Sequence, residues 1–464
     1  MELLTALDSE DTQRRVAGAL HARGLGPGDR VAMGTASSGA MLSAIIGALR
    51  VGIVPVVLNA GLLAHERAAL LADARPALEV DDALLAALVE GPPDELAPVP
   101  LARPMHYTSG TSGTPKGVWS GLLGESAAVA LFDEEAELWG FEAGDRHLVC
   151  SPLHHSAPIR FAAGTLLRGG SVVILGHFDA TAASEVIGEY RPTTAFMVPS
   201  HLQRLFARVP SDASGAPDHA ALDLSSFRLL AHAGAACPPP LKRAAISAFP
   251  AGTVWEFYGS TEGQFTACSA GEWERHPGTV GRARPHRRLA VDPDGTIWCS
   301  VPDYGRFVYW DDPVRTAAAW REPVPGSRDD EDPRAEGHDE PRASFTVGDL
   351  GRLDDDGYLW LDGRRDDLII SGGVNVYPVE VEAALAHAPG VEQVAVFGVD
   401  DESWGQRVCA AVVGGADPAE VRRYARTVLA AYKCPKDVYR VEALPHTSTG
   451  KLQRGAVAEH LGLG

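Results

Sequence analysis

The chain has 464 residues, 45% of them hydrophobic and 22% charged, and its formal net charge is −20. This length predicts more than one domain, and the acidic balance excludes general nucleic-acid binding, which needs a basic surface. The longest apolar run, near residues 41–49, is too short for a membrane span, and the N-terminus does not resemble a signal peptide. Six cysteines without a CxxC pair are typical of reduced thiols. We therefore expect a cytoplasmic enzyme or binding protein.

Helices and apolar strands alternate through the first half of the chain. Helices are expected at residues 9–25 and 38–49, and a strand follows at 54–58. This alternation predicts parallel α/β layers, in which ligands bind at the carboxyl ends of the strands. Further strands of the same kind are expected at residues 147–150, 171–175, 195–198, 227–231 and 253–257.

Two polar segments interrupt this pattern, at residues 210–219 and 323–341, and we expect both to be surface loops, the second mobile. A new pattern of strands and helices begins after Arg364, which predicts a small separate α/β domain. The boundary gives an N-terminal domain of residues 1–365 and a C-terminal domain of residues 366–464. In the C-terminal domain, strands are expected at residues 391–399, 407–413 and 438–441, together with a helix capped by Asp417.

Residues 107–118, YTSGTSGTPKGV, combine three glycines, five Ser or Thr hydroxyls and one lysine. Such a loop offers backbone N–H groups, hydroxyl donors and a cation to phosphate oxygens. It is not the common P-loop, because Pro115 precedes Lys116 and Gly117 follows it. An ordinary surface turn is the alternative interpretation of such a cluster.

Other segments carry groups that suit a nucleotide. Residues 254–263, VWEFYGSTEG, place an aromatic ring, which suits a purine, close to a carboxylate, which suits Mg²⁺. Asp349 can accept two hydrogen bonds from neighbouring hydroxyls. Lys451 lies in PHTSTGKLQR near the C-terminus, where a lysine is usually solvated.

These motifs, in this order, resemble the adenylate-forming superfamily of acyl- and aryl-CoA synthetases, peptide-synthetase adenylation domains and beetle luciferases. The segments PLHHSAP and GRRDDLIISGGVNVYPVEVE are most similar to acyl-CoA synthetases. The resemblance implies an α/β fold with a large multi-layer N-terminal domain and a small mobile C-terminal domain. It also implies ATP and Mg²⁺ as cofactors, CoA as a co-substrate and a small-molecule acid as substrate.

The resemblance further implies individual roles. Tyr258 would stack on adenine, Glu262 would hold Mg²⁺, Asp349 would bind the ribose, and Lys451 would bridge the carboxylate and phosphate oxygens. The C-terminal domain would then rotate about Asp366 and shape a thiol tunnel with residues 372–373. The implied ATP-binding residues are Thr108, Ser109, Gly110, Thr111, Ser112, Gly113, Thr114, Lys116, Gly234, Ala235, Ala236, Phe257, Tyr258, Gly259, Asp349 and Arg364. The implied catalytic residues are His155, Thr261, Glu262, Asp366 and Lys451.

Two departures from the family pattern stand out: Val347 replaces the usual Thr, and the region before the phosphate loop is short. The motifs leave the acceptor open between CoA, a carrier protein and an amine, and they do not exclude nitrite in place of a carboxylic acid. They are also compatible with a homodimer. A non-enzymatic ATP-binding module would predict that Glu262 or Lys451 is replaced, and both are present. We expect the acid pocket to lie between residues 154 and 263, narrowed by Trp255 and Phe257.

Overall fold

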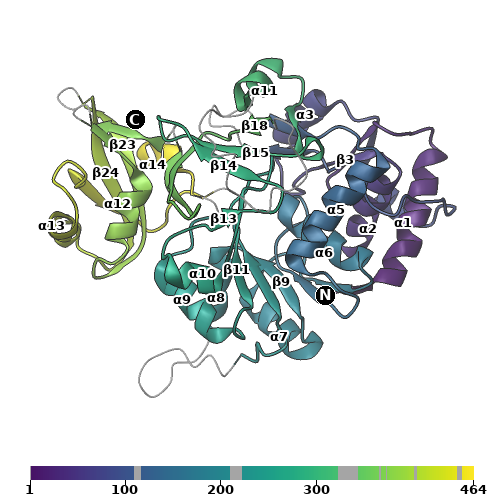
Figure 1. Ribbon diagram of the computed structural model, residues 1–464, viewed down its shortest axis with the longest axis horizontal. Helices are drawn as coiled ribbons and strands as arrows, with labels where there is room; N and C mark the ends of the chain where they lie inside the picture. The colour runs from purple at the N-terminus through teal and green to yellow at the C-terminus, as the bar shows by residue number, and fades with distance from the viewer. Residues whose placement is uncertain are drawn as a thin grey trace. The chain divides into compact units, whose positions relative to one another are not determined.

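The computed structural model describes residues 2–108, 116–208, 222–321, 343–364, 367–371, 374–401, 405–446 and 452–463. The chain forms two compact units, here called the N-terminal unit (Met1–Leu289 and Cys299–Phe345) and the C-terminal unit (Ala290–Trp298 and Thr346–Gly464) (Figure 1). The predicted domain boundary at residue 365 stays a prediction. The polar segments 210–219 and 323–341 lie outside the described residues.

The N-terminal unit is built on an eight-stranded sheet with the order β1-β8-β7-β9-β10-β11-β12-β13. Its five central strands are parallel, as the sequence predicts, whereas β1, β12 and β13 pair antiparallel at the two ends. The strands are β1 (Glu2–Thr5), β7 (Arg146–Val149), β8 (Ser171–Ile174), β9 (Thr194–Met197), β10 (Leu229–His232), β11 (Val254–Glu256), β12 (Thr266–Ser269) and β13 (Arg282–Ala283).

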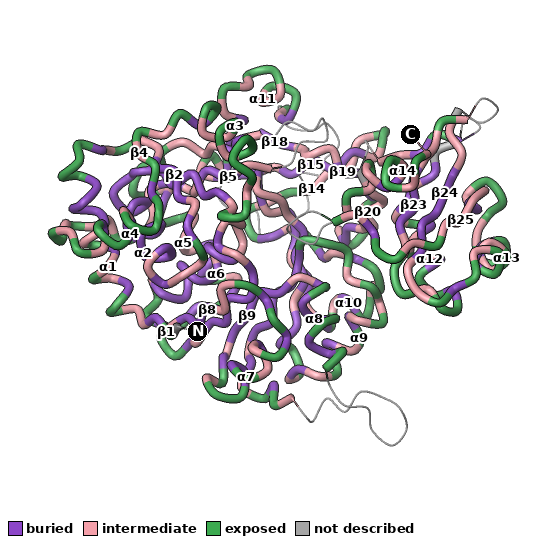
Figure 2. The backbone as a smooth tube through the Cα atoms, turned by 180° about the vertical axis from the view of Figure 1, so that it is seen from behind, coloured by how far each residue is buried: buried purple, intermediate pink, exposed green. Residues whose placement is uncertain are grey.

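Helices cover both faces of this sheet because its side chains alternate between two apolar clusters. Phe196 of β9 packs in a cluster with α5 and α6, whereas its neighbours Ala195 and Met197 pack with α7, α8 and α9. The central strands are buried along their length, and they are purple in Figure 2. The covering helices are α1 (Ala6–His21), α2 (Gly39–Arg50), α5 (Glu125–Trp139), α6 (Ser156–Leu167), α7 (Ala180–Tyr190), α8 (Pro199–Phe206) and α9 (Pro239–Ala248).

Two three-stranded sheets complete the layers that matter for the site. β2 (Arg30–Met33) pairs in parallel with β3 (Val54–Val57) and β4 (Leu78–Val80). β6 (Lys116–Trp119) pairs antiparallel with β5 (His106–Thr108) and β16 (Val308–Tyr309). The other elements of this part of the chain are α3 (Ala64–Ala74), α4 (Asp82–Leu88), α10 (Ala270–Arg275), β14 (Arg288–Val291), β15 (Ile297–Ser300), η2 (Asp303–Gly305), α11 (Pro313–Ala319), β17 (Trp320–Arg321) and β18 (Ser344–Phe345).

The C-terminal unit has its own core. A long antiparallel pair, β23 (Val391–Asp401) and β24 (Gly405–Gly414), contributes buried apolar side chains to both clusters of this unit, and α12 and α13 pack against it. Asp417 caps α13 with its carboxylate, as the sequence predicts. The other elements are β19 (Asp349–Leu353), β20 (Leu359–Arg364), β21 (Ile369–Ser371), β22 (Val374–Val376), α12 (Pro378–Leu385), α13 (Pro418–Val428), β25 (Asp437–Arg440), η4 (Arg454–Ala456) and α14 (Val457–His460).

The predicted α/β class and the parallel order are confirmed, and the predicted strands agree with the observed ones to within a few residues. The strand β1 was not expected, because four residues at a chain end carry too little periodicity to predict it. Among the described residues, no helix combines the length and apolar character needed to cross a membrane.

Candidate active site

The hairpin of β5 and β6 fixes both ends of the predicted phosphate loop. Thr108 and Lys116 are cross-strand partners, so the chain leaves and re-enters the sheet at one place. The residues between them, among them the predicted Ser109, Gly110, Thr111, Ser112, Gly113 and Thr114, lie outside the described residues. The sheet therefore holds the loop's two ends at a fixed separation, with the cation of Lys116 at one of them.

One aromatic ring links Lys116 to Glu262. The Tyr309 hydroxyl donates a hydrogen bond of 2.9 Å to Glu262 Oε1, and both residues are buried. Lys116 Nζ lies 4.6 Å from the centroid of the same ring, within the range of a cation–π contact. β16 carries Tyr309 and pairs with β6, which places the ring beside Lys116. The structure thus brings together the predicted phosphate-binding cation and the predicted Mg²⁺ ligand.

The other predicted nucleotide-binding residues of this unit follow two neighbouring parallel strands. Gly234, Ala235 and Ala236 are exposed directly after β10, and Phe257 and Tyr258 follow β11. Because these strands are parallel, their carboxyl ends meet at one edge of the sheet. Gly234 has a φ of +91°, a conformation that favours glycine.

The two aromatic residues after β11 differ in their surroundings. The Tyr258 ring contacts Phe265 at 4.7 Å between centroids, and its backbone N–H donates to Thr266 Oγ1. Phe257 packs among Trp139, Phe161 and Phe196 in the core. Gly259 is in close contact with the Gln264 side chain, because a Cβ there would lie 2.5 Å from Gln264 Oε1 and would displace its amide. The loop that carries Thr261 and Glu262 is therefore tightly packed.

A buried ionic cluster, absent from the sequence predictions, anchors the two strand ends. His232 and Glu256 are the last residues of β10 and β11, and Lys242 of α9 hydrogen-bonds both, with 3.3 Å between Lys242 Nζ and Glu256 Oε2. Burial lowers the pKa of His232 well below its usual value and raises the pKa of Glu256. The cluster ties together the bases of the two loops that carry the predicted nucleotide contacts.

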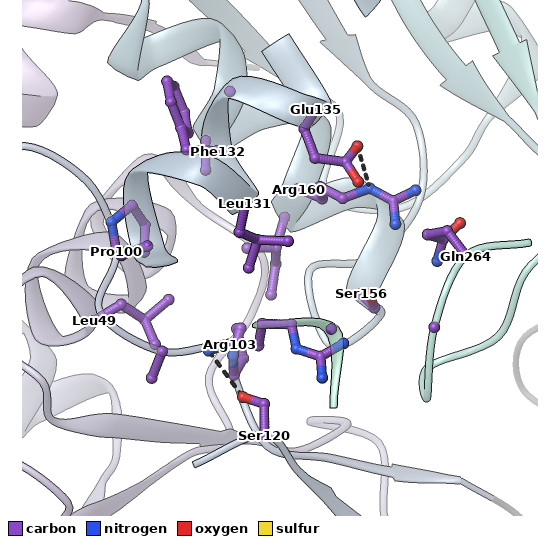
Figure 3. A pocket seen from close by; sticks show the side chains of 18 of the residues that line it. Leu49, Pro100, Arg103, Ser120, Leu131, Phe132, Glu135, Ser156, Arg160 and Gln264 are labelled. Atoms are coloured by element: carbon purple, nitrogen blue, oxygen red, sulfur yellow. Dashed lines mark hydrogen bonds and ion pairs between the residues drawn. The ribbon is translucent and has the colours of Figure 1, made fainter. Parts of the chain in front are cut away.

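A cavity of about 160 Å³ lies between α5, α6 and the Thr261–Gln264 loop (Figure 3). Thr261, Gly263 and Gln264 of this loop line it, and so do the arginines Arg103, Arg160 and Arg287. The rest of the wall is largely apolar. Its apolar residues are Leu49, Pro100, Ala102, Pro104, Val118, Ala128, Leu131, Phe132, Phe141, Ile159, Ala163, Leu167 and Val301.

This cavity differs in two respects from the acid pocket that the sequence predicts. Its lining extends well beyond residues 154–263, because α5 and the segments near Leu49, Pro100 and Val301 close it from other directions. Trp255 and Phe257 are not among its described lining residues, since their rings pack against Trp139 instead. The lining residues are far apart in the sequence, and the packing of helices onto the sheet brings them together, so the sequence alone does not predict the lining.

The histidines precede α6 at the rim of the site. His155 occupies the N-cap position of α6, and Ser156 after it lines the cavity, whereas His155 is not among the described lining residues. The rings of His154 and His155 lie 4.0 Å apart. His106 Nδ1 donates to the carbonyl of His154 at 3.1 Å, and burial lowers the pKa of His106 to about 4. These side chains hold the start of α6 in place beside the cavity.

Five charged residues form a largely buried network, and three of them line the cavity. Arg284, fully buried, contacts Glu135 at 2.8 Å and Glu134 at 3.5 Å. Arg287 contacts Glu134 at 3.0 Å, and Arg160 lies 3.4 Å from Glu135. Burial alone would raise the pKa of Glu135, but Arg160 and Arg284 lower it to about 2. Glu135 is therefore ionised, and arginines contact both glutamates.

Arg103 is a further, partly buried cation that the motifs did not indicate. Its guanidinium donates to the carbonyls of Glu262 at 3.3 Å and Arg306 at 2.8 Å, and no carboxylate lies within 4.0 Å among the described residues. Burial, followed by repulsion from Arg287 and Arg160, lowers the pKa of Arg103 to about 10.

The remaining predicted residues belong to the C-terminal unit. Asp349 begins β19, is buried, and is the cross-strand partner of Arg364 in β20. The side chain of Arg364 and residues Asp366, 372–373 and Lys451 lie outside the described part of the chain. Arg454, three residues after Lys451, bonds Glu382 at 2.9 Å and also Asp367. These bonds fix the end of the predicted lysine segment to the core of its own unit.

Comparison with known proteins gives consistent matches along the chain. A family model described as AMP-binding enzyme matches residues 4–99 and 103–300, and one described as AMP-binding enzyme C-terminal domain matches residues 380–451. The chain is 30% identical to an indoleacetate–CoA ligase of Aromatoleum aromaticum, over 96% of this chain and 91% of that protein. It is 32% identical to a feruloyl-CoA synthase of an Amycolatopsis species, over 99% and 94%. The crystal structure of ATP-bound MatB from Rhodopseudomonas palustris superposes with a TM-score of 0.79 at 28% identity, covering 98% of this chain and 93% of that one.

Proposed function

The chain belongs to the AMP-binding enzyme family, and we propose that its N-terminal unit binds ATP and an acid through the residues described above. The protein is an AMP-forming acid–CoA ligase. In this reaction an acid carboxylate attacks the α-phosphorus of ATP, which releases pyrophosphate and leaves an acyl-adenylate. The sulfur of CoA then attacks the acyl carbon, and AMP leaves.

The Lys116–Tyr309–Glu262 arrangement carries the proposed site. Lys116 would contact the β- and γ-phosphates beside the hydroxyls of the phosphate loop, and Glu262 would hold Mg²⁺. The site fits this ion, because Mg²⁺ is typically held by one or two carboxylates together with the phosphates of the substrate. When bound, the ion would offset the negative charge that builds on the phosphates. Tyr309 would orient the carboxylate that holds it.

The loops after β10 and β11 supply the proposed adenine site. Gly234, Ala235 and Ala236 offer small side chains and exposed backbone, against which a flat base can lie. Tyr258 would contribute its ring, and Thr261 would donate its hydroxyl to the α-phosphate. Asp349, with Arg364 opposite it in the C-terminal unit, would accept hydrogen bonds from the ribose hydroxyls.

Lys451 is the proposed catalytic cation, and Asp366 the proposed pivot of the C-terminal domain. The ammonium group would neutralise the two anions that approach each other, the carboxylate and the α-phosphate. We expect Lys451→Ala to nearly abolish acid-dependent ATP–pyrophosphate exchange and to spare thioester formation from a supplied acyl-adenylate. Lys433→Ala is the matched control, because Lys433 pairs with Glu380 on the same unit. Equal loss of both half-reactions would contradict the assigned role.

The cavity limits the acid. An apolar cavity of roughly 150 Å³ accommodates a benzene ring, so a volume of about 160 Å³ fits a compact aromatic or medium alkyl acid. Nitrite would leave the apolar wall uncovered, and it serves as the discriminating member of a substrate panel. If nitrite is the only acid in the panel that gives pyrophosphate release, nitrite and not a carboxylic acid is the substrate.

Transfer to a carrier protein or an amine, and a homodimeric assembly, are secondary hypotheses that the same panel and a mass measurement in solution would test. A cytoplasmic location is supported by the six cysteines, all free thiols in the structure.

A further inference from the structure

Charge is unevenly distributed in the acid cavity. Its apolar wall is formed by α5, α6 and the segments near Leu49 and Pro100, whereas its charged lining residues are three arginines and one glutamate, Arg103, Arg160, Arg287 and Glu135. Figure 3 shows Glu135 and Arg160 in contact near Gln264, with Arg103 beside Ser120 and the apolar Leu49 and Pro100 further along the wall. An uncharged or singly charged acid does not require such a wall.

The buried charges do not cancel. The network behind the wall contains Arg160, Arg284 and Arg287 against Glu134 and Glu135, which leaves one positive charge. Arg103 adds a second, because it binds backbone carbonyls and forms no ion pair with a described carboxylate. The carboxylate of Glu262 also attracts Arg103, but it is the proposed ligand of Mg²⁺ and is left out of this count. A charge that is withdrawn from water without a partner costs free energy. Two such cations in one cavity indicate that anions complete the site.

The three cavity arginines differ in what their donors contact. Arg287 places both terminal nitrogens on the carboxylate of Glu134 at 3.0 Å, and its Nε is buried without a hydrogen-bond partner among the described residues. Arg160 makes a single contact of 3.4 Å with Glu135, and its Nη2 is buried without a hydrogen-bond partner among the described residues. The same holds for Nε of Arg103. What distinguishes Arg103 and Arg160 from Arg287 is the lack of a close carboxylate pair: Arg103 contacts only carbonyls, and Arg160 has one contact of 3.4 Å with Glu135. These two guanidinium groups are therefore the ones that can bind an anion.

The two arginines occupy different places in the cavity. Arg103 contacts the backbone of Glu262 and therefore lies at the reacting end, beside the proposed metal ligand. Arg160 projects from α6 next to Phe257, at 5.2 Å from its ring centroid, with Glu135 of α5 on its other side. One arginine can thus meet the carboxylate that is activated while the other meets a different group of the same molecule.

We propose that this ligase takes an acid with a second anionic group, such as a dicarboxylic acid, whose second carboxylate binds Arg160. The reacting carboxylate binds Arg103 in the ground state and accounts for one of the two surplus charges, and the second carboxylate accounts for the other. The phosphates of ATP bind other groups, namely Lys116, the phosphate loop and Mg²⁺, so they do not account for these two arginines. This inference rests on the proposed function, because it assigns the substrate class of the same cavity.

The test compares matched acids that differ by one carboxylate, at saturating MgATP and CoA, with pyrophosphate release as the readout. The pairs are benzoate against benzene-1,2-, 1,3- and 1,4-dicarboxylate, and butanoate against butanedioate. We expect kcat/KM for at least one diacid to exceed that of its monoacid at least tenfold, which corresponds to about 1.4 kcal/mol.

Variants separate recognition of the second anion from structural damage. Arg160→Gln should raise KM for the preferred diacid at least tenfold, while KM for ATP and turnover of the matched monoacid change less than threefold. Arg160→Lys should recover part of the diacid preference, because it restores the cation. Arg168→Gln is the control, since Arg168 at the end of the same helix pairs with Asp133 at the exposed surface.

The outcomes are distinct. Monoacids that are turned over as well as their diacids, or an Arg160→Gln variant that slows both members of a pair equally, would overturn the second-anion proposal and leave the ligase function intact. A panel in which no acid releases pyrophosphate would overturn the proposed function, and the substrate class with it.

Discussion

Removal of the Tyr309 hydroxyl tests the link between the phosphate-binding cation and the proposed metal ligand. In Tyr309→Phe the aromatic ring stays, so the contact with Lys116 Nζ at 4.6 Å is preserved. What disappears is one hydrogen bond of 2.9 Å to Glu262 Oε1, between two residues that are each about 5% exposed. The variant therefore changes the environment of a single carboxylate oxygen.

The expected size of the effect follows from the charge of the acceptor. A hydrogen bond to a charged group contributes about 1.5–3 kcal/mol, and loss of a group that orients a metal ligand typically costs about 10–100-fold in metal affinity or activity. Because the phosphates of ATP also hold the ion, we expect a loss of metal affinity at the lower end of this range, about tenfold. We expect the Mg²⁺ concentration that gives half-maximal pyrophosphate release to rise about tenfold, with little change in KM for the acid.

The assay is pyrophosphate release at saturating ATP and acid as Mg²⁺ is varied. Tyr304→Phe is a matched control, because the Tyr304 hydroxyl donates an equivalent bond of 3.0 Å to Glu134, which has no proposed metal role. The reasoning is refuted if the Mg²⁺ dependence of Tyr309→Phe equals that of the wild type. It is also refuted if both variants shift this dependence equally.

Three further predictions concern stability, followed by urea unfolding. Arg284→Met should lower the free energy of unfolding by about 3–5 kcal/mol, because it leaves two buried glutamates short of a partner, whereas Arg168→Met at the surface should change it by less than about 1 kcal/mol; equal effects would contradict this. Burial lowers the pKa of His106 from 6.5 to about 4. Between these pH values the imidazole is protonated in the unfolded chain and neutral in the folded one, so the free energy of unfolding falls as the pH drops from 6.5 to 4. His106→Gln should reduce that slope by about 1.4 kcal/mol per pH unit, and an unchanged slope would show that another group controls it. Gly164→Ala should cost about 1–3 kcal/mol, because the new Cβ would lie 2.2 Å from the ring of Phe141; a neutral result would mean that the ring moves freely.

The layered fold was predictable because parallel buried strands are short apolar runs with a clear period. The runs at β8 to β11 have no competing interpretation, and Asp417 before Pro418 marks a helix start by itself. The antiparallel edge strand β1 was missed, because its pairing with β8 joins residues that are distant in sequence. Local pattern identifies elements of this kind, whereas tertiary pairing decides the ends of the sheet.

The candidate site divides in the same way. Tyr258 and Glu262 stand in one contiguous motif, so their types and spacing identify them. Tyr309 and Arg103 stand outside that motif, and only the tertiary fold brings them to Glu262, so the sequence does not identify them. The cavity is hardest to predict, since its wall combines residues from Leu49 to Val301. The acidic run Asp133–Glu135 interrupts the apolar positions of α5, and such an interruption is the kind of signal that could have revealed the buried ionic network.

The central claim is that the acid is activated as an adenylate before it reaches CoA. Incubation with MgATP, CoA and an acid whose carboxylate is labelled with ¹⁸O tests it most directly, with AMP and acyl-CoA measured by mass spectrometry. Attack of the carboxylate on the α-phosphorus predicts one carboxylate oxygen in each AMP, and AMP equal in amount to acyl-CoA. Unlabelled AMP, or ADP with labelled inorganic phosphate, would contradict the account.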